Sequence, residues 1–236
     1  MHFRRTRNNE RKGLAEGRDP HYEGPWKDSN KKAEALKRIA AGESAAIRFR
    51  APKKSYTFTD TVKGEVTFPE NMVGDFVLLR ANGLPTYNYC CVVDDALMKI
   101  SHVIRGDDHL NNTLRQLMLY EALGFNLPEF MHVSLLVGKD RQKLSKRHGA
   151  TSVGQYCEDH WLPEALNNYL CLLGWSHPQE KDVFNCFELG ELFDATRFSK
   201  SPALYDMEKL AYINGQHIKH MNVDEIFSRV ESTKVF

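Results

Sequence analysis

Met131-His132-Val133-Ser134-Leu135-Leu136-Val137 is an apolar run, and the basic segment Lys143-Leu144-Ser145-Lys146-Arg147-His148-Gly149 follows it after five residues. The apolar run predicts a buried strand, and the basic segment predicts a loop at its carboxyl end. Open α/β sheets bind ligands at the carboxyl ends of their strands. Ammonium and guanidinium groups there suit phosphate oxygens, as point charges or as a planar fork. The sequence therefore predicts chemistry on a nucleotide triphosphate at this edge.

Composition limits the class of protein. With 236 residues, the chain can form one large or two small domains with a core of their own. No apolar run has the length of a membrane span, and the first residues lack the apolar core of a secretory signal, so we expect no membrane partner. The cysteines show no CxxC spacing, and no histidine completes a chelating pattern with them, which predicts free thiols and no protein-bound metal: Cys90, Cys91, Cys157, Cys171 and Cys186.

Charge is distributed unevenly along the chain. Residues 1–54 hold 15 Lys and Arg against 7 Asp and Glu, whereas the remainder holds 17 against 24. A basic N-terminal segment beside an acidic remainder is expected where one face meets a polyanion such as RNA. A solvated helix face would show the same excess, so the charge pattern leaves both interpretations open.

The order of predicted elements favours an α/β fold. A basic helix is expected at 29–41, followed by strands of a small β-rich subdomain at 45–50, 64–68 and 75–80. Next come strands at 86–93 and 102–105, a helix at 112–123 capped by Asn111 or Asn112 and ended by Gly124, and the strand at 131–137. Beyond Thr151 the pattern is helical, with helices near 162–174, 189–193, 207–213 and 223–230.

Several motifs stand in a specific order around the basic loop. They are Gly83–Asn88 with Val92–Asp95, His102–His109 with Asn111–Thr113, Arg147–Val153, Leu162–Leu170 and Leu173–Ser176. In this order and spacing, from about residue 20 to 220, the chain resembles bacterial-type glutamyl-tRNA synthetase, a class I aminoacyl-tRNA synthetase. The Lys143–Arg147 segment is then similar to the second class I signature loop.

The resemblance implies a domain plan. Residues 1–88 would be part of an α+β insertion that binds the tRNA acceptor stem. Residues 89–150 would be the second half of a class I Rossmann-like parallel sheet, which is the nucleotide-binding catalytic domain with the basic loop. Residues 151–236 would form the α-helical stem-contact region and the start of the anticodon-binding region.

The resemblance also implies roles in ATP binding. Lys146 is similar to the signature lysine that steadies the triphosphate while the glutamate carboxylate attacks the α-phosphate, and Lys143 to its supporting cation. Charge moves onto the leaving pyrophosphate, and a cation placed for that state lowers the barrier. The adenosine site is implied at Asp108, His109, Leu135 and Leu136, although His109 could equally be an ordinary capping histidine.

A glutamate pocket is implied by three further residues. Arg105 is similar to the residue that pairs with the γ-carboxylate, which would favour glutamate over glutamine. A structural salt bridge from Arg105 to Asp94, Asp95 or Asp107 is the alternative. Tyr87 matches a tyrosine of the amino-acid pocket, with a core aromatic as its alternative, and Cys91 stands where some members carry asparagine.

Substrates and partners follow from the same resemblance. ATP, with Mg²⁺ accompanying it, L-glutamate and tRNA(Glu) are expected for a ligase that makes glutamyl-adenylate and passes glutamate to the 3′-terminal ribose. The family implies a monomer, in the cytoplasm or else in a mitochondrial matrix or plastid stroma. Nothing in the 236 residues indicates whether charging is restricted to one tRNA.

The first class I signature, His-x-Gly-His, does not occur in these 236 residues. Backbone donors and imidazoles of that signature cradle ATP at the start of a helix. We therefore expect the sequence to be a fragment, inactive by itself in adenylate formation. Two alternatives are a non-catalytic tRNA-binding module and a shorter relative that attaches glutamate to a modified tRNA base.

Overall fold

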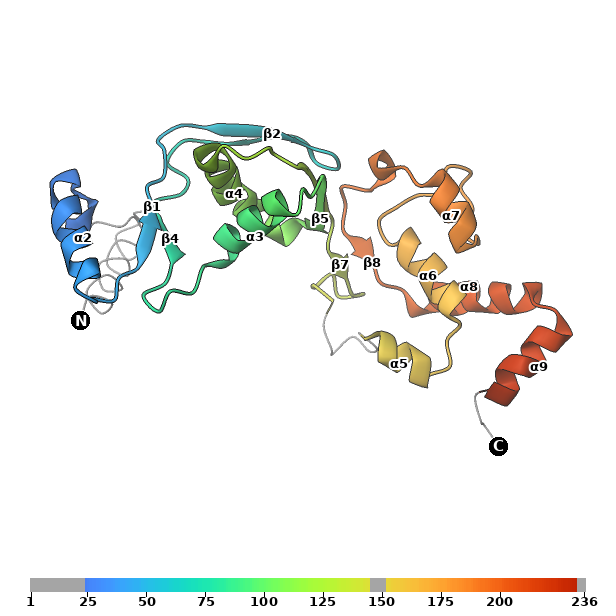
Figure 1. Ribbon diagram of the computed structural model, residues 1–236. Coiled ribbons are helices and arrows are strands. Elements are labelled where there is room, and N and C mark those ends of the chain that lie inside the picture. The colour runs from blue at the N-terminus through green and yellow to red at the C-terminus, as the bar shows by residue number, and fades with distance from the viewer. Residues whose placement is uncertain (1–23, 145–151, 233–236) are drawn as a thin grey trace. The chain divides into compact units, whose positions relative to one another are not determined.

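The computed structural model describes residues 24–144 and 152–232, which form two compact units (Figure 1). The first unit contains the described residues up to Asp60 together with Gly64–Val103 and His109–Phe130. The second contains Thr61–Lys63, Ile104–Asp108 and the described residues from Met131 onward. Within the described residues, every helix is too short or too polar to cross a membrane.

The first unit begins with short helical turns and a basic helix. Turns η1 (Pro25–Lys27) and η2 (Ser29–Lys31) lead into α2 (Lys32–Ala40), and Gly42 at φ 89° follows the last turn. A positive φ is a conformation that glycine adopts without strain, so the predicted helix and its stop are confirmed. Strand β1 (Ile47–Phe49) then pairs antiparallel with β4 (Phe76–Leu79). Both lie within strands predicted from the sequence, at 45–50 and 75–80.

A four-stranded sheet has the order β3-β2-β6-β5. Its strands are β2 (Tyr56–Asp60), β3 (Gly64–Phe68), β5 (His102–Gly106) and β6 (Glu129–Val133). β2 pairs antiparallel with β3 and parallel with β6. β2 was not predicted, although its Tyr, Thr and Phe residues favour a strand and its burial alternates strictly. The sheet is thus mixed, with a parallel pair at its centre.

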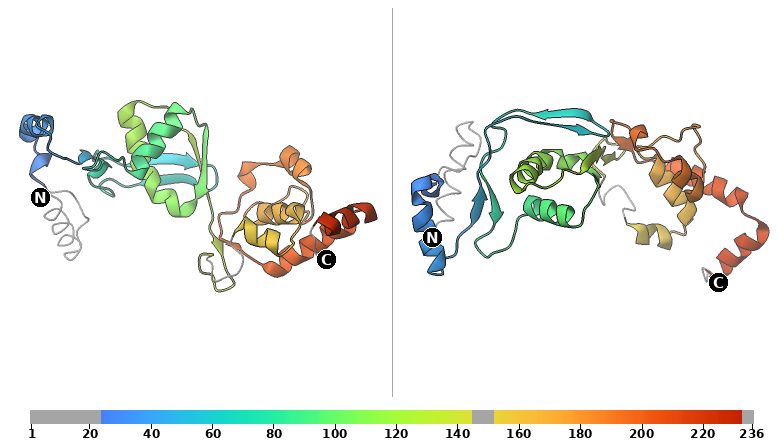
Figure 2. Two further views of the ribbon diagram at one scale, coloured as in Figure 1. Left: turned by 60° about the horizontal axis from the view of Figure 1, so that its bottom comes forward. Right: turned by 45° about the horizontal axis from the view of Figure 1, so that its top comes forward.

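The predicted strand at 86–93 is wrong, because this stretch is helix α3 (Tyr87–Leu97). Tyr89, Val92 and Ala96 recur at helical spacing and pack against the core that also holds Phe58 and Leu114. The β-branched and aromatic composition favours a strand only as a weak local preference, and packing against the sheet overrides it. Figure 2 shows α3 and α4 (Leu110–Leu123) next to the antiparallel hairpin of β2 and β3.

The start of α4 also differs from expectation. A single turn η3 (Asp107–His109) leads directly into α4, so the helix begins before the predicted capping residues Asn111 and Asn112. No side chain caps its first turn. Its end is as predicted, because Gly124 adopts the left-handed conformation at φ 66°.

The strand predicted at 131–137 is two strands. β6 ends at Val133, and β7 (Leu136–Val137) pairs parallel with β8 (Ala203–Leu204) in a separate two-stranded sheet. The amide of Ala203 donates to the carbonyl of Leu135 at 3.2 Å, and that of Tyr205 donates to Val137 at 2.8 Å. An apolar run cannot reveal that its two halves have different partners, since the pairing depends on residues far along the chain.

The remainder of the second unit is helical. Its core consists of buried aromatic and aliphatic side chains from several helices: Tyr156, Ala165, Leu166, Tyr169, Tyr205, Leu210 and Ile213. Pro163 opens one of these helices, as predicted. The helices are α5 (Val153–Glu158), which was not predicted, α6 (Pro163–Leu172), α7 (Cys186–Leu192), η5 (Ala195–Arg197), α8 (Met207–His220) and α9 (Val223–Ser232).

Candidate active site

The residues predicted for the site are distributed between the two units. The second unit carries Arg105, Asp108, Leu135, Leu136 and Lys143, and the first carries Tyr87, Cys91 and His109. Lys146 lies outside the described residues, as does the segment from Ser145 to Thr151.

Arg105 lies near the end of β5 and contacts the neighbouring strand. Its Nε donates a hydrogen bond to Nε2 of His132 at 3.1 Å. His132 belongs to β6 and has no exposed surface. In the sequence, His132 could be considered only as a metal ligand, for which its spacing was unsuitable. The contact arises because β5 and β6 are neighbours in the sheet.

Asp107 forms an ion pair with a lysine of a turn that is distant in the sequence. Lys63, in the turn between β2 and β3, places its ammonium 2.8 Å from Asp107 Oδ2. The same ammonium lies 3.3 Å from Ser134 Oγ and 3.4 Å from the carbonyl of Lys200. Lys63 thereby links the end of β5, the segment between β6 and β7, and the segment before β8. In sequence it is only a lysine before a turn glycine, so no signal indicated this role.

Asp108 forms an ion pair with a lysine of the predicted signature loop. Lys143 Nζ lies 2.7 Å from Asp108 Oδ2. A Cβ added at Gly106 would stand 2.7 Å from Asp108 Oδ1 and 3.4 Å from a methyl group of Leu135. Three predicted residues, Asp108, Leu135 and Lys143, therefore lie close to the end of β5 and to β7, and a side chain at residue 106 would displace the Asp108 carboxylate.

The first part of the basic loop is a tight turn. The amide of Gly138 donates to the carbonyl of Gln142, and Arg141, at φ 58°, donates back to Gly138. The amide of Leu144 then donates to the carbonyl of Leu136 at 2.9 Å, and the backbone of Lys143 pairs with Val137 in an isolated antiparallel β-bridge. Lys143 is held beside β7 by this turn.

Lys139, also in this turn, has a different partner. Its ammonium lies 2.9 Å from Glu208 Oε1 in α8, a contact that raises the pKa of Lys139. The cations of the basic segment thus do not all face one anion.

In the first unit, Tyr87 lies at the first turn of α3 and is half exposed, so it is not a core aromatic. Its hydroxyl lies 3.3 Å from Nδ1 of His109, and the rings are 5.8 Å apart. Asn112 Nδ2 lies 3.2 Å from the same nitrogen. Cys91 follows Tyr87 by one helical turn and occupies the same face of α3. Tyr87 and His109 are thus brought together, as a shared pocket would require.

In the part of the chain that the structure describes, no group of three or more His, Cys, Asp or Glu side chains could hold a metal ion. All five cysteines are thiols outside any disulfide.

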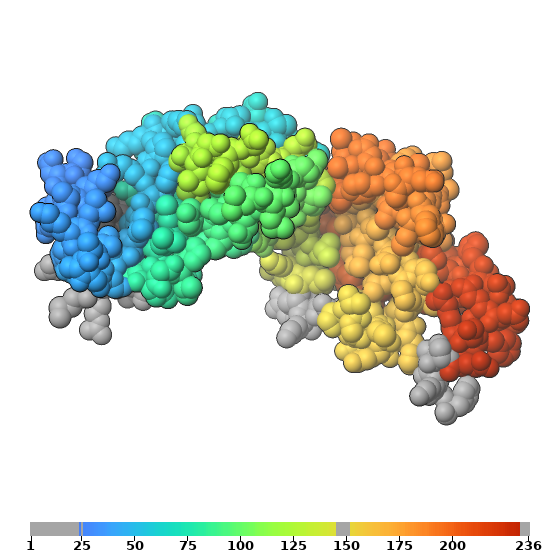
Figure 3. Space-filling view, viewed as in Figure 1, coloured from blue at the N-terminus to red at the C-terminus, as the bar shows by residue number. Residues whose placement is uncertain are grey.

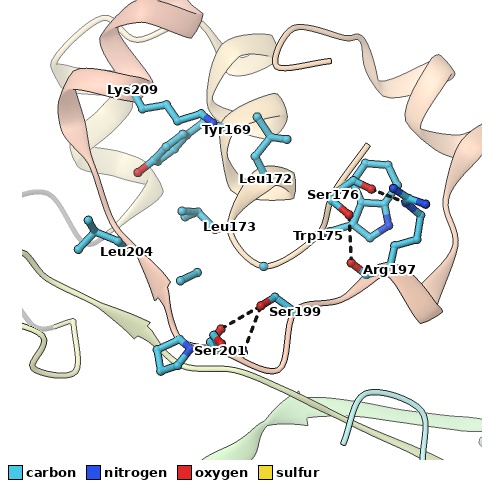
Figure 4. Close-up of a pocket in the computed structure, with 13 residues that line it drawn as sticks. Tyr169, Leu172, Leu173, Trp175, Ser176, Arg197, Ser199, Ser201, Leu204 and Lys209 are labelled. Carbon is cyan, nitrogen blue, oxygen red and sulfur yellow. Dashed lines mark hydrogen bonds between the residues drawn. The ribbon is translucent and has the colours of Figure 1, made fainter. Parts of the chain in front are cut away.

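A separate pocket of about 420 Å³ lies in the second unit, and Figure 4 shows its lining. Tyr169, Leu173 and Trp175 form part of its wall, and Arg197 and Lys209 also line it. Arg197 Nε donates to the carbonyl of Ser176 at 2.7 Å, and Lys209 lies 2.8 Å from Asp182. Both cations are thus bound within the chain, and none of the predicted site residues that the structure describes lines this pocket.

Comparison with protein families identifies the fold. Residues 2–212 match the family of class I tRNA synthetases (E and Q), catalytic domain. The chain belongs to this family. This class I synthetase domain is 50% identical over 217 residues to glutamate–tRNA ligase 1 of Fervidobacterium nodosum, covering 90% of the chain and 46% of the relative. It is 45% identical over 223 residues to the glutamate–tRNA ligase of Bdellovibrio bacteriovorus, covering 94% and 45%.

Solved structures agree with the class I assignment. A glutamate tRNA ligase of Elizabethkingia meningosepticum, crystallised with its amino acid, matches at TM-score 0.86 and 27% identity, over 98% of this chain and 51% of that one. The resemblance predicted from the motifs and the α/β fold class are confirmed. The class I domain described here spans about half the length of the curated relatives it matches.

Proposed function

We propose that this chain contributes the second half of the catalytic domain of a glutamate–tRNA ligase, together with parts of the acceptor-stem and stem-contact regions. The observation that carries this proposal is the match to glutamate–tRNA ligases over nine-tenths of the chain. The lysine and carboxylate pairs at the end of β5 and beside β7 support it, because they place cations where an α/β sheet binds nucleotides. The domain limits at residues 88 and 150 belong to this proposal.

In this proposal ATP binds beside Lys143, Lys146, Asp108, His109, Leu135 and Leu136. A glutamate carboxylate oxygen attacks the α-phosphorus, and the bond to pyrophosphate breaks. Lys146 and Lys143 neutralise the charge that develops on the leaving pyrophosphate. Lys143 is bound to Asp108 at 2.7 Å, so the triphosphate competes with that carboxylate for the ammonium. Mg²⁺ enters with ATP as part of the substrate.

The amino acid binds to Arg105, Tyr87 and Cys91. The guanidinium of Arg105 receives the γ-carboxylate through two parallel hydrogen bonds. The hydroxyl of Tyr87, supported by His109 at 3.3 Å, orients the substrate. Cys91 lines the same face of α3 and offers a weaker polar contact than asparagine would.

The acceptor for the activated glutamate is the 3′-terminal ribose of tRNA(Glu). The basic N-terminal segment of the chain supports contact with the phosphate backbone. We propose that the ligase acts as a monomer in the cytoplasm, with a mitochondrial matrix or plastid stroma as the other compartments that bacterial-type translation allows.

The test is ATP–pyrophosphate exchange in a two-part mixture. The 236-residue chain is combined with the parts of the Fervidobacterium nodosum relative that this chain does not cover. We expect exchange that depends on glutamate and not on glutamine, and none from the 236-residue chain alone. Lys146→Ala should lower exchange by about 10²–10³-fold. Lys219→Ala, an exposed lysine of α8, serves as the control and should leave exchange unchanged. Exchange that depends on another amino acid, or no exchange from two folded parts, contradicts the proposal.

A further inference from the structure

The hydrogen bond between Arg105 and His132 fixes the state of the histidine ring. The two atoms, Nε of Arg105 and Nε2 of His132, are 3.1 Å apart. A guanidinium group carries only donors, so Nε2 must accept. The imidazole is then neutral, with its proton on Nδ1. Because His132 has no exposed surface, the ring is held in place by the protein around it.

The same bond also restricts the arginine. A hydrogen bond through Nε fixes the rotation of the guanidinium plane about the Cδ–Nε bond. The direction of both Nη groups is then fixed as well, because the guanidinium is planar. A carboxylate that binds through two parallel hydrogen bonds needs the fork in one orientation. His132, one strand away, therefore sets how Arg105 presents itself to an anion.

We propose that His132 is a positioning residue of the glutamate site, which orients Arg105 for the γ-carboxylate and so supports the choice of glutamate over glutamine. This inference rests on the proposed function, because it takes Arg105 as the residue that binds the carboxylate. The side-chain amide of glutamine offers one acceptor oxygen and one NH₂ group. If the guanidinium is fixed, one of its N–H groups binds the oxygen and another faces the NH₂ donor, which is unfavourable. A guanidinium that rotates loses part of this discrimination and part of its preorganisation.

Two substitutions separate positioning from packing. His132→Gln keeps an acceptor oxygen within reach of Nε, whereas His132→Phe keeps a ring of similar shape and removes the acceptor. In the two-part exchange assay, His132→Phe should raise the KM for glutamate by about 10–100-fold. The KM for ATP should stay within about twofold, because a loss confined to one substrate is a loss of binding to that substrate alone. His132→Gln should recover most of the affinity for glutamate.

Nuclear magnetic resonance provides a readout that does not depend on activity. In the ¹⁵N-labelled 236-residue chain near neutral pH, the His132 ring should be neutral and protonated at Nδ1. The Nε–H of Arg105 should exchange slowly with water, and that protection should disappear in His132→Phe. Circular dichroism shows whether each variant is folded before its kinetics are compared.

Three results would overturn the inference. The first is a charged ring, or one protonated at Nε2, in the unsubstituted chain. The second is an unchanged KM for glutamate in a folded His132→Phe protein, and the third is an equal loss in His132→Gln and His132→Phe. An unsubstituted mixture without glutamate-dependent exchange would instead contradict the proposed function, and the ring protonation would still decide whether the positioning contact exists.

Discussion

At the scale of single residues, the end of β5 is where the functional interactions concentrate. Arg105, Asp107 and Asp108 stand almost in succession, and each meets a side chain from a different segment. The partners come from β6, from the turn between β2 and β3, and from the loop after β7: His132, Lys63 and Lys143. Residues 105–108 thus contact three other segments of the chain, and Gly106 lies between Arg105 and the two aspartates.

Gly106→Ala tests how tightly this stretch is packed. The new Cβ would lie 2.7 Å from Asp108 Oδ1, so the carboxylate must rotate away and weaken its ion pair with Lys143. We expect a loss of about 1 kcal/mol in the free energy of unfolding, measured by urea denaturation. Gly215→Ala in α8 is the control, because a Cβ there meets nothing within 4 Å, and it should stabilise by about 0.4–1 kcal/mol. A Gly106→Ala protein as stable as the unsubstituted chain would contradict the packing.

How much of the site could be predicted depends on the kind of signal. Lys143, Asp108 and Leu135 could be found because family motifs preserve their order, and they do come together. His132 and Lys63 could not, because no motif links them to Arg105 and Asp107, which lie 27 and 44 positions away in the sequence. Such contacts depend on strand order and hairpin geometry, which residue types alone do not specify.

At the scale of elements, the turn between β2 and β3 acts through Lys63. The side chains of Lys63 and Asp107 are 18% and 27% exposed, so the ion pair is partly shielded from water. The pair of Lys209 and Asp182 has the same 2.8 Å separation but is 43% and 54% exposed. The two pairs match in length and in chemical type, but differ in burial and in the further contacts of Lys63 with Ser134 and Lys200.

Lys63→Met should therefore destabilise the chain more than Lys209→Met. Losing the shielded pair leaves Asp107 without its cation, which costs about 1–3 kcal/mol. Losing the exposed pair costs at most about 1 kcal/mol, because water replaces the partner. The free energy of unfolding in urea measures both, and equal losses would show that Lys63 does no more than a surface lysine.

Helix α9 is tied to α6 by a two-pronged ion pair. Arg229 donates to both oxygens of Glu164, at 3.1 and 2.8 Å, and this hydrogen bonding lowers the pKa of Glu164 below its usual value. A carboxyl whose pKa is lowered in the folded state stabilises the fold above its unfolded pKa. That contribution disappears as the pH falls through the folded pKa.

Arg229→Met should consequently lower the free energy of unfolding only at pH values where Glu164 is ionised in the folded chain. Because both side chains are more than one-third exposed, the unsubstituted chain should exceed the variant by only about 0.5 kcal/mol near neutral pH. The difference should vanish in acid below the folded pKa of Glu164, where this carboxyl is protonated in both proteins. Urea midpoints measured across this range provide the check, and a difference that persists in acid would exclude Glu164 as its source.

Elements were predictable where local chemistry determines them. Pro163 and Gly124 mark helix ends by their backbone preferences, and both ends were correct. α3 was assigned as a strand because its composition suits one, whereas its burial follows a helical period. β6 and β7 were joined because one apolar run can serve two sheets. These errors share a cause, namely that tertiary packing decides what composition leaves open.

At the scale of the whole molecule, charge is distributed unevenly along the chain. The first 54 residues carry 15 basic against 7 acidic side chains. In α2, Lys32 and Lys37 are exposed, and Figure 3 shows this helix at the surface of the first unit. Arg38, in contrast, is bound to Glu43 at 2.7 Å. Within α2, the exposed lysines and not Arg38 are therefore the cations available to a phosphate.

The 236-residue chain should bind tRNA with an affinity that falls steeply and linearly on a logarithmic salt scale, because each neutralised phosphate releases counterions. Replacing Lys32 and Lys37 by Gln should weaken binding and reduce the slope by roughly 1 for each phosphate that is no longer neutralised. Lys99→Gln, an exposed lysine outside the basic N-terminal segment, should leave the slope unchanged. Filter binding at several salt concentrations measures both quantities. If Lys99→Gln reduced the slope as much per charge, the binding would reflect net charge and not a surface formed by α2.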